Sequence, residues 1–239
     1  GIDINMGCPA AKVVSSCHGS ALIRDPDLAA RLVEATVKAV KIPVSVKTRL
    51  GWDTHETLIP FCKRLVDAGA QAFAIHGRRY HDKFSGKANW EPIYALKEAV
   101  KVPVIGNGDI ASGADAVGRI GNLDGVMVGR GTFGNPWVMA EIVNSLTRLF
   151  VDSNRINELT NQPVNESATA TTLSFEDKIP VILEHCELAV RLKGERRGML
   201  EMRRHLSSYV KGFDGAREMR EKLIRVERLE DAKAILCAD

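Results

Sequence analysis

Short apolar strands alternate with amphipathic helical stretches along residues 1–150, and this rhythm constrains the fold more than any other feature. The strand candidates are Ile2–Ile4, Pro43–Lys47, Ala72–His76, Pro103–Asn107 and Gly125–Gly129. The helical candidates are residues 26–40, 56–68, 91–100, 113–120 and 136–149. Near-continuous apolar strands separated by helices are typical of a parallel sheet that is buried on both faces.

This pattern predicts an α/β fold, a TIM (β/α)8 barrel of which residues 1–150 supply the last five strand–helix units. We expect the other three units to precede Gly1, because no strand pattern follows Phe150. Residues 151–175 are rich in Asn, Ser and Thr and are expected to form a linker. Residues 176–239 show only helical periodicity and predict a small helical domain. Its expected helices lie near 176–193, 198–211, 214–225 and 230–237.

The composition is that of an ordinary globular protein, since 45% of the 239 residues are hydrophobic and 26% are charged. The net charge of +3 is too small to identify a nucleic-acid partner and does not exclude one. No apolar run is long enough to span a bilayer, so we expect no membrane partner. The five cysteines are widely spaced and form no CxxC or Cys/His pattern. We therefore expect reduced thiols, no metal and a cytoplasmic location.

Each strand candidate ends in polar residues or glycine, at the edge where parallel α/β folds place their chemistry. The last two strands lead into Gly106–Asp109 and Gly129–Gly131. Glycines in such turns let backbone amides approach phosphate oxygens. We expect a phosphate site here with Arg130 as a charged contact. The alternative is a pair of tight turns without a ligand.

Lys47 and Arg49 alternate along one strand and therefore point to the same side of the sheet. Two cations inside a barrel need an anion or an electron-rich partner, such as the pyrimidine edge of a flavin. The alternative is a salt bridge to Asp109. His76 ends the following strand and is expected either to donate to a cofactor oxygen or to cap its strand.

Cys8 lies on a turn directly after the first strand, between Gly7 and Pro9. Gly7 permits unusual backbone conformations, and Pro9 stops the strand. An ordinary thiol is mostly protonated at neutral pH, so Cys8 is predicted to deliver a proton in a reaction. The remaining cysteines are expected to be packing residues: Cys17, Cys62, Cys186 and Cys237.

Basic residues gather in the C-terminal helical region, where seven lie between Arg191 and Lys211 against two acidic residues. Such a surface suits an RNA phosphate backbone, and the alternative is an ordinary solvated helix face. The candidate phosphate contacts are Arg191, Lys193, Arg196, Arg197, Arg203 and Arg204.

Several motifs occur in an order that resembles the tRNA-dihydrouridine synthases, most closely the bacterial B-type branch. They are Asp3–Pro9, Gly19–Leu22, Lys47–Trp52, His76–Arg78, Gly106–Asp109, Gly129–Gly131 and Gly134–Trp137. The resemblance covers about residues 1–145 and continues more loosely into the C-terminal helices, which resemble that family's tRNA-binding domain. It implies an FMN-dependent oxidoreductase that reduces uridine in tRNA to 5,6-dihydrouridine with NADPH, monomeric when full-length.

The resemblance also implies residue roles. Cys8 would protonate carbon 5 of a uracil that Asn5 orients, with Arg49 on the substrate side. Lys47 and His76 would contact FMN. The remaining residues implied at the cofactor site and its phosphate-holding turns are Asn107, Gly108, Asp109, Gly129 and Arg130. The basic helix residues would bind tRNA.

Two features depart from the family pattern. The segment that supplies three barrel units and part of the flavin site is absent before Gly1, and Ser16-Cys17-His18 replaces a small, Gly/Ala-rich stretch. We therefore expect the chain to fold poorly or to bind FMN weakly unless partners complete its sheet. Two alternatives stay open. One is another FMN barrel that reduces a free pyrimidine, like dihydropyrimidine or dihydroorotate dehydrogenase. The other is a truncated, catalytically silent RNA-binding protein.

Overall fold

The computed structural model describes residues 1–152 and 173–237, so most of the predicted linker lies outside the described residues. The described chain divides into two compact units. The first contains Gly1–Gly131 together with the later part of a helix that begins at Val138. The second contains Thr132–Glu141 and the C-terminal helices.

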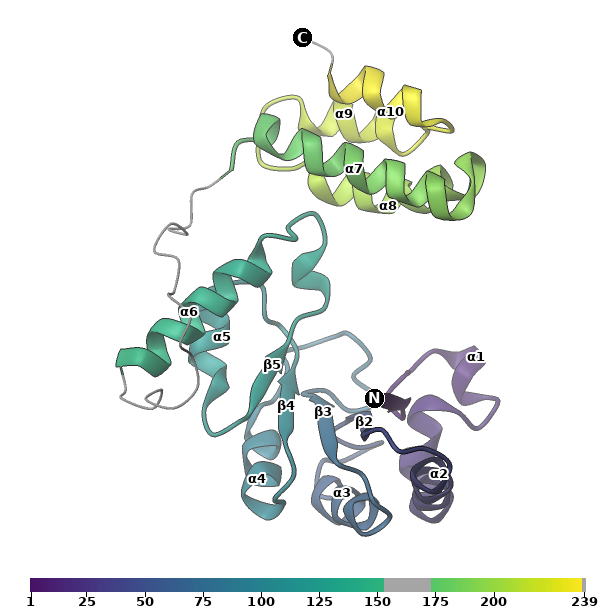
Figure 1. The fold of residues 1–239 in the computed structure, drawn as a ribbon, viewed down its shortest axis with the longest axis vertical. Helices are drawn as coiled ribbons and strands as arrows, with labels where there is room; N and C mark the ends of the chain where they lie inside the picture. Colours follow the sequence, from purple (N-terminus) through teal and green to yellow (C-terminus); the bar gives the residue numbers. More distant parts are fainter. Residues whose placement is uncertain (153–172, 238–239) are drawn as a thin grey trace. The chain divides into compact units, whose positions relative to one another are not determined.

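The first unit is built on five parallel strands that pair in sequence order (Figure 1). The strands are β1 (Ile2–Asn5), β2 (Val44–Arg49), β3 (Ala72–His76), β4 (Val104–Asn107) and β5 (Gly125–Met127). All five predicted strands are confirmed, although β2 extends to Arg49 and β5 ends at Met127. Parallel strands in sequence order are the arrangement of a barrel-like α/β fold rather than of a doubly wound sheet.

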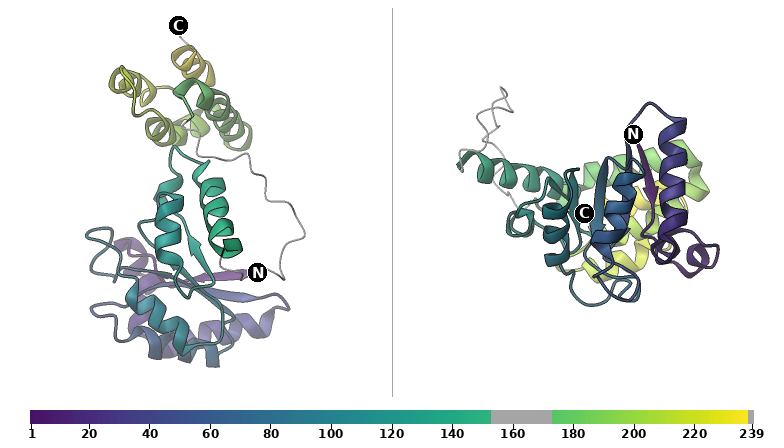
Figure 2. Two further views of the ribbon diagram at one scale, coloured as in Figure 1. Left: turned by 90° about the vertical axis from the view of Figure 1, so that its left-hand side faces the viewer. Right: turned by 90° about the horizontal axis from the view of Figure 1, so that it is seen from below.

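The five helices predicted between and after the strands are also present. They are α2 (Pro26–Ala39), α3 (Leu58–Asp67), α4 (Glu91–Ala99), α5 (Gly113–Ile120) and α6 (Val138–Asp152). Helices α2, α3 and α4 lie side by side along one face of the sheet in Figure 1, and the views in Figure 2 agree. Right-handed crossovers between successive neighbouring strands place every helix on the same face. The sequence did not predict α1 (Ala11–Val14) or the 3-10 turns η1 (Gly19–Arg24) and η2 (Arg130–Thr132).

Side chains of β2 alternate between the two faces of the sheet. Val44, Val46 and Thr48 are buried. Lys47 and Arg49 therefore occupy the opposite face, as the alternation predicted. Strand order and alternation together bring the polar strand ends to one edge and one face of the sheet.

Gly106 lets a tryptophan cover β4 on its helix-facing side. A Cβ at this position would lie 2.1 Å from Cζ3 of Trp90, and the Trp90 residue is only 7% exposed. We expect Gly106→Ala to lower the free energy of unfolding by about 1–3 kcal/mol, because the indole has no room to move aside. Urea denaturation measures this loss.

The control is Gly118→Ala in α5, where a Cβ would meet nothing within 4 Å. Alanine has the higher helix propensity, so this variant should gain up to about 1 kcal/mol. Equal effects of the two substitutions would contradict the packing argument for Gly106.

The second unit contains the four helices predicted after Phe175: α7 (Phe175–Lys193), α8 (Glu195–Tyr209), α9 (Ala216–Leu223) and α10 (Leu229–Leu236). Their core includes Ile182, Met199, Met202, Leu206 and Leu223. None of the described helices is both long and apolar enough to cross a membrane.

Residues 132–141 pack with these helices. A Cβ on Gly134 would lie 2.0 Å from the carbonyl oxygen of Ser208, so only glycine fits against α8. Trp137 packs on the core of the helical unit. The sequence pattern predicted that this segment belongs to the barrel, whereas its contacts place it in the second unit with the C-terminal helices.

The cysteines divide into two groups. Cys62 and Cys186 are fully buried, which confirms them as packing residues, and burial raises the pKa of both thiols. Cys17 and Cys237 are exposed, so the packing prediction is wrong for these two. Cys17 lies in the turn between α1 and η1 with φ of 58°, a local geometry that spacing alone does not predict.

Candidate active site

The register of the sheet places the predicted site residues side by side on neighbouring strands, in one row across β1 and β2 and a second row across β2, β3 and β4. Asn5 pairs with Lys47 across β1 and β2. Arg49 pairs with His76, and His76 pairs with Asn107 across the next two strands. Because paired residues of parallel strands share a face, these five side chains leave the same face of the sheet.

The main chain of Cys8 is held at both ends. Asn5 Oδ1 accepts hydrogen bonds from the backbone N–H of Gly7 at 3.0 Å and of Cys8 at 3.1 Å. The carbonyl oxygen of Cys8 accepts from the N–H of Ser20 at 3.0 Å. The thiol is half-buried. The turn after β1 is thus fastened to η1, which fixes the position from which the thiol acts.

Gly19 lies directly against this turn. Its φ is +59°, and a Cβ there would be 2.8 Å from the carbonyl oxygen and 3.0 Å from Cβ of Cys8. We expect Gly19→Ala to displace Cys8 and to change its rate of alkylation by iodoacetamide, because access of the reagent to a half-buried thiol helps to set that rate. Mass spectrometry of the Cys8 peptide measures the rate, with exposed Cys237 as internal reference.

The matched control for this substitution is Gly86→Ala. Gly86 has a similar φ of +66° but no atom within 4 Å of a Cβ, so it carries the backbone strain without the collision. An unchanged Cys8 alkylation rate in Gly19→Ala, or an equal change in Gly86→Ala, would show that contact with Gly19 does not position the thiol.

Arg49 is 3% exposed, and its guanidinium joins three loop carbonyls. Nε donates to the carbonyl oxygen of Gly7 at 2.8 Å. Nη1 donates to the carbonyl oxygens of Arg79 at 3.2 Å and Lys83 at 2.8 Å. Burial, and next the charge of Arg78, lower the pKa of Arg49 to about 10, so it stays charged at neutral pH. The residue predicted on the substrate side therefore also ties the turn carrying Cys8 to the loop after β3.

Lys47 has an amide rather than a carboxylate as its hydrogen-bond partner. Its Nζ donates to Oδ1 of Asn107 at 3.3 Å, and Asn107 Nδ2 donates to the carbonyl oxygen of Met127 at 2.8 Å. Burial, followed by repulsion from Arg49, lowers the pKa of Lys47 although Asp3 opposes this. Within the described residues Lys47 forms no salt bridge, so a pairing of Lys47 or Arg49 with Asp109 is not what holds these cations.

Asp109 pairs instead with Arg78, a residue that the sequence did not single out as a site residue. Both carboxylate oxygens accept from Arg78 Nη2 at 2.8 Å, and Oδ2 accepts from the N–H of Ala88 at 2.7 Å. Arg130 Nη2 lies 3.7 Å from the same carboxylate. Burial alone would raise the pKa of Asp109, but the hydrogen bonds from Ala88 and Arg78 lower it overall. Asp109 thus orders the loops after β3 and β4.

His76 is almost fully buried among cations. Burial first, then Arg49, Lys47 and Arg78, lower its pKa to about 3, so the ring is neutral at physiological pH. Its Nε2 lies 3.4 Å from Nη1 of Arg78. A Cβ on Gly108, at φ +130°, would lie 3.2 Å from Cδ2 of the ring. A neutral imidazole can offer one N–H to a ligand without adding charge.

The turn after β5 has open space beside Gly129 and carries the cationic side chain of Arg130. A Cβ on Gly129 would meet nothing within 4 Å, and the Arg130 side chain is 60% exposed. In the neighbouring strand, Asn107 ends β4 and pairs with Met127 of β5, and Gly108 follows directly. An exposed turn and an exposed guanidinium are what a phosphate group needs.

The six basic candidates of the helical unit differ in what they contact. Arg203 donates to the carbonyl oxygens of Val226 and Arg225, so it is a structural residue. Lys193 and Arg197 both pair with Glu201. The other three are exposed. Arg191 and Arg196 form no ion pair among the described residues, and the guanidinium of Arg204 lies over the ring of Phe133. These three are the strongest candidates for a phosphate backbone. No group of three potential metal ligands occurs in the described parts of the chain.

Comparisons with known proteins agree with the motifs of this site. A probable tRNA-dihydrouridine synthase of Rickettsia bellii is 41% identical over 92% of this chain and 63% of its own length. Another, from Synechocystis sp., is 37% identical over 98% of the chain and 62% of its own length. The tRNA-dihydrouridine synthase B of Pseudomonas aeruginosa is 38% identical over 98% of the chain and 65% of its own length. The chain thus spans less than two thirds of the length of these relatives. A family model described as dihydrouridine synthase matches residues 1–238, and the chain therefore belongs to the dihydrouridine synthase family.

Proposed function

We propose that the protein reduces uridine in tRNA to 5,6-dihydrouridine, with FMN as cofactor and NADPH as electron source. One observation carries the proposal: Cys8, held at both ends of its main chain, lies at the same sheet edge as a half-buried Lys47 that has no carboxylate partner in the described chain. An acid at the same sheet edge as a cation without a carboxylate partner suits proton delivery beside a group that becomes negatively charged.

The residues present fit FMN. Lys47 would hold the pyrimidine edge of the flavin, where negative charge accumulates on reduction, and neutral His76 would donate to a ring oxygen. Gly108, Gly129 and Arg130 would hold the phosphate. Asn107 would position Lys47, because it accepts from Nζ. When bound and reduced, FMN supplies the hydride that reaches carbon 6 of the uracil.

The chain's own groups complete the reaction. Asn5 uses Oδ1 for the Cys8 turn, and its Nδ2 forms no hydrogen bond within the described residues, so it can donate to a uracil carbonyl oxygen. The Cys8 thiol gives its proton to carbon 5, and the resulting thiolate takes a proton from water. Arg49 holds the Gly7 carbonyl and thereby the turn that carries the acid.

The tRNA would be bound chiefly through Arg191, Arg196 and Arg204. The other three basic residues would add positive charge to the same surface while they also form bonds within the helical unit: Lys193, Arg197 and Arg203. The target base must leave its stack to reach a buried flavin. A separate basic surface that holds the tRNA backbone supports this step, because backbone contacts supply affinity while the base is turned outward. We expect a cytoplasmic, monomeric enzyme.

The proposal is tested with two measurements on the purified protein. Flavin is quantified from visible absorbance after denaturation, and dihydrouridine is quantified by mass spectrometry after incubation of unmodified tRNA with FMN and NADPH. Flavin binding together with dihydrouridine formation supports the proposal. Reduction of free uracil or orotate, with tRNA left unchanged, would favour a free-pyrimidine enzyme instead. Binding of tRNA without flavin would favour a silent RNA-binding protein.

A further inference from the structure

Side chains from the loops after β1, β2 and β3 form a cluster of rings on unit one. Trp52 stacks on Tyr80 with ring centroids 3.8 Å apart and an angle of 15° between the planes. His81 packs edge-on against both rings, at 5.9 Å and 5.2 Å. Arg24 lies over Trp52, with Cζ 4.9 Å from the ring centroid. We call these four residues the aromatic corner.

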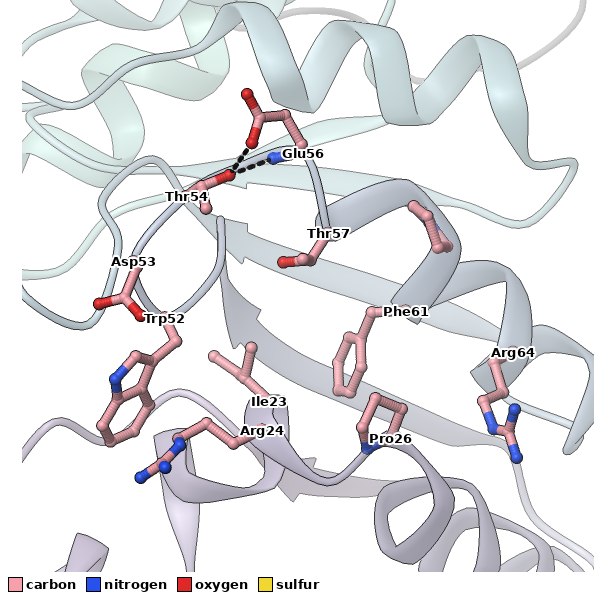
Figure 3. A pocket seen from close by; sticks show the side chains of 11 residues that line it. Ile23, Arg24, Pro26, Trp52, Asp53, Thr54, Glu56, Thr57, Phe61 and Arg64 are labelled. Carbon is pink, nitrogen blue, oxygen red and sulfur yellow. Dashed lines mark hydrogen bonds between the residues drawn. The ribbon is translucent and has the colours of Figure 1, made fainter.

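A cavity of about 730 Å³ opens beside the aromatic corner (Figure 3). Ile23, Pro26 and Phe61 give it apolar walls, and Arg24 and Trp52 line one side. Its size falls in the range of about 300–1,000 Å³ that is typical of small-molecule sites. Hydroxyl and carboxylate groups lie around it, and the Thr54 hydroxyl and the Glu56 carboxylate are joined by a short hydrogen bond (Figure 3).

Two charged side chains that line the cavity, Arg24 and Glu56, form no ion pair within the described residues. Arg64 is paired with Asp27, and His81 Nε2 lies 2.7 Å from the Asp53 carboxylate. Arg24 is exposed and forms no ion pair within residues 1–152 and 173–237. Its guanidinium, which lies over the Trp52 ring, therefore presents a positive charge without an ion-pair partner on one side of the cavity. An anionic ligand with a flat apolar part matches this arrangement.

We propose that the aromatic corner and its cavity bind an unpaired nucleotide of the tRNA adjoining the target uridine; this inference rests on the proposed function. A nucleobase has two apolar faces, which can pack between Pro26, Phe61 and the Arg24 guanidinium. Its phosphate is the counter-charge that Arg24 lacks. The acceptor groups of Thr54 and Glu56 suit the amino edge of a base. Unstacked bases are recognised in this way, by aromatic and guanidinium planes and by hydrogen bonds at base edges.

The connectivity explains why a neighbouring nucleotide would bind here. Segment η1 begins beside Cys8, through Gly19 and Ser20, and ends at Arg24. The loop after β2 likewise begins at Arg49, which holds the Cys8 turn, and reaches Trp52 three residues later. The same two segments thus form the candidate active site and the aromatic corner. A flipped uridine leaves its neighbour without a stacking partner, and the corner would supply one.

The test compares Arg24→Gln with Arg31→Gln in binding of unmodified tRNA at fixed salt. Arg31 is an exposed arginine on the adjoining helix α2 and controls for the loss of one positive charge. We expect Arg24→Gln to weaken binding about tenfold, equivalent to about 1.4 kcal/mol and within the range for one stacked base. Arg31→Gln should bind close to the parent. Irradiation of the parent complex at ultraviolet wavelengths should crosslink tRNA to the peptides containing Trp52 or Tyr80.

Equal affinities of the two variants would overturn the inference, and so would crosslinks that map only to the helical unit. Both results would leave the proposed function intact, because the parent protein would still bind tRNA and flavin. A parent protein that binds no tRNA would overturn the proposed function and this inference together. Flavin content, measured separately, then shows whether the cofactor part of the proposed function survives.

Discussion

Replacing Cys8 with alanine should lower the rate of dihydrouridine formation by about 10²–10⁴-fold, the usual contribution of a positioned general acid. The loss should come from chemistry, not from folding. The thiol is half-buried, and the contacts that fix the turn are made by the backbone of Cys8, which alanine keeps. Flavin content and tRNA affinity should therefore match the parent while product formation, measured by mass spectrometry of digested tRNA, is lost.

Two variants sharpen this test. Cys17→Ala removes an exposed thiol nine residues away in the following loop and should leave the rate close to that of the parent. Cys8→Ser puts a hydroxyl in the place of the thiol, and because a hydroxyl is a much weaker acid this variant should recover little activity. If Cys8→Ala retained most of the parent's rate, another group would be the acid and the proposed role of Cys8 would be wrong.

The fold could be predicted to a large extent because its signal is local and periodic. Apolar strands such as Ala72–His76 and amphipathic helices such as Gly113–Ile120 were located to within a residue or two. Element ends were less predictable. Strand β2 continues through two polar residues, Thr48 and Arg49, to its end at Arg49. Both are buried, and they pair with Ile75 and His76 of β3. Tertiary pairing overrides the rule that strands end where polar residues begin.

The candidate site was predictable in its members but not in their contacts. Position at a strand end identified Lys47, His76 and Asn107, and the register brings them together. Arg78 was missed because it follows β3 by two residues in a loop and meets Asp109 only through tertiary folding. The hydrogen bond from the N–H of Ser20 to the carbonyl oxygen of Cys8 was missed for the same reason. A contact between two loops produces no periodic pattern in the sequence. The sequence signal was that each partner lies in a motif of its own, Cys8 in Asp3–Pro9 and Ser20 in Gly19–Leu22.

Replacing Arg78 with methionine should lower the free energy of unfolding by about 3 kcal/mol, which urea denaturation can measure. Arg78 is 3% exposed at its side chain and Asp109 is 25% exposed. Methionine keeps the apolar stem but removes the donors to Asp109, to Ser85 at 3.0 Å and to Gly86 at 2.6 Å. Breaking a buried pair typically costs about 3–5 kcal/mol, and here Asp109 would keep only the longer ion pair with Arg130. The partial exposure of Asp109 places the expected loss at the lower end.

The adjacent arginine provides a matched control. Arg79 also pairs with an aspartate, Asp82, but their side chains are 42% and 28% exposed. Arg79→Met should therefore lower the free energy of unfolding far less than Arg78→Met, because an exposed ion pair is screened by solvent. A similar loss in both variants would show that burial does not set the strength of the Arg78 pair.

The pH dependence separates the ion pair from the other contacts of Arg78. The pKa of Asp109 is lowered in the folded protein, so its contribution to stability is present above the unfolded carboxyl pKa of about 3.9 and is lost as pH falls through the lower folded value. In Arg78→Met the Asp109 carboxylate keeps only the N–H of Ala88 and the longer ion pair with Arg130, so it becomes less costly to bury once it is protonated. The stability gap between parent and variant should therefore be widest near neutral pH and should narrow below about pH 4. A gap that stays constant with pH would mean that the bonds to Ser85 and Gly86, rather than the charge of Asp109, make Arg78 important for the loop that orders the site.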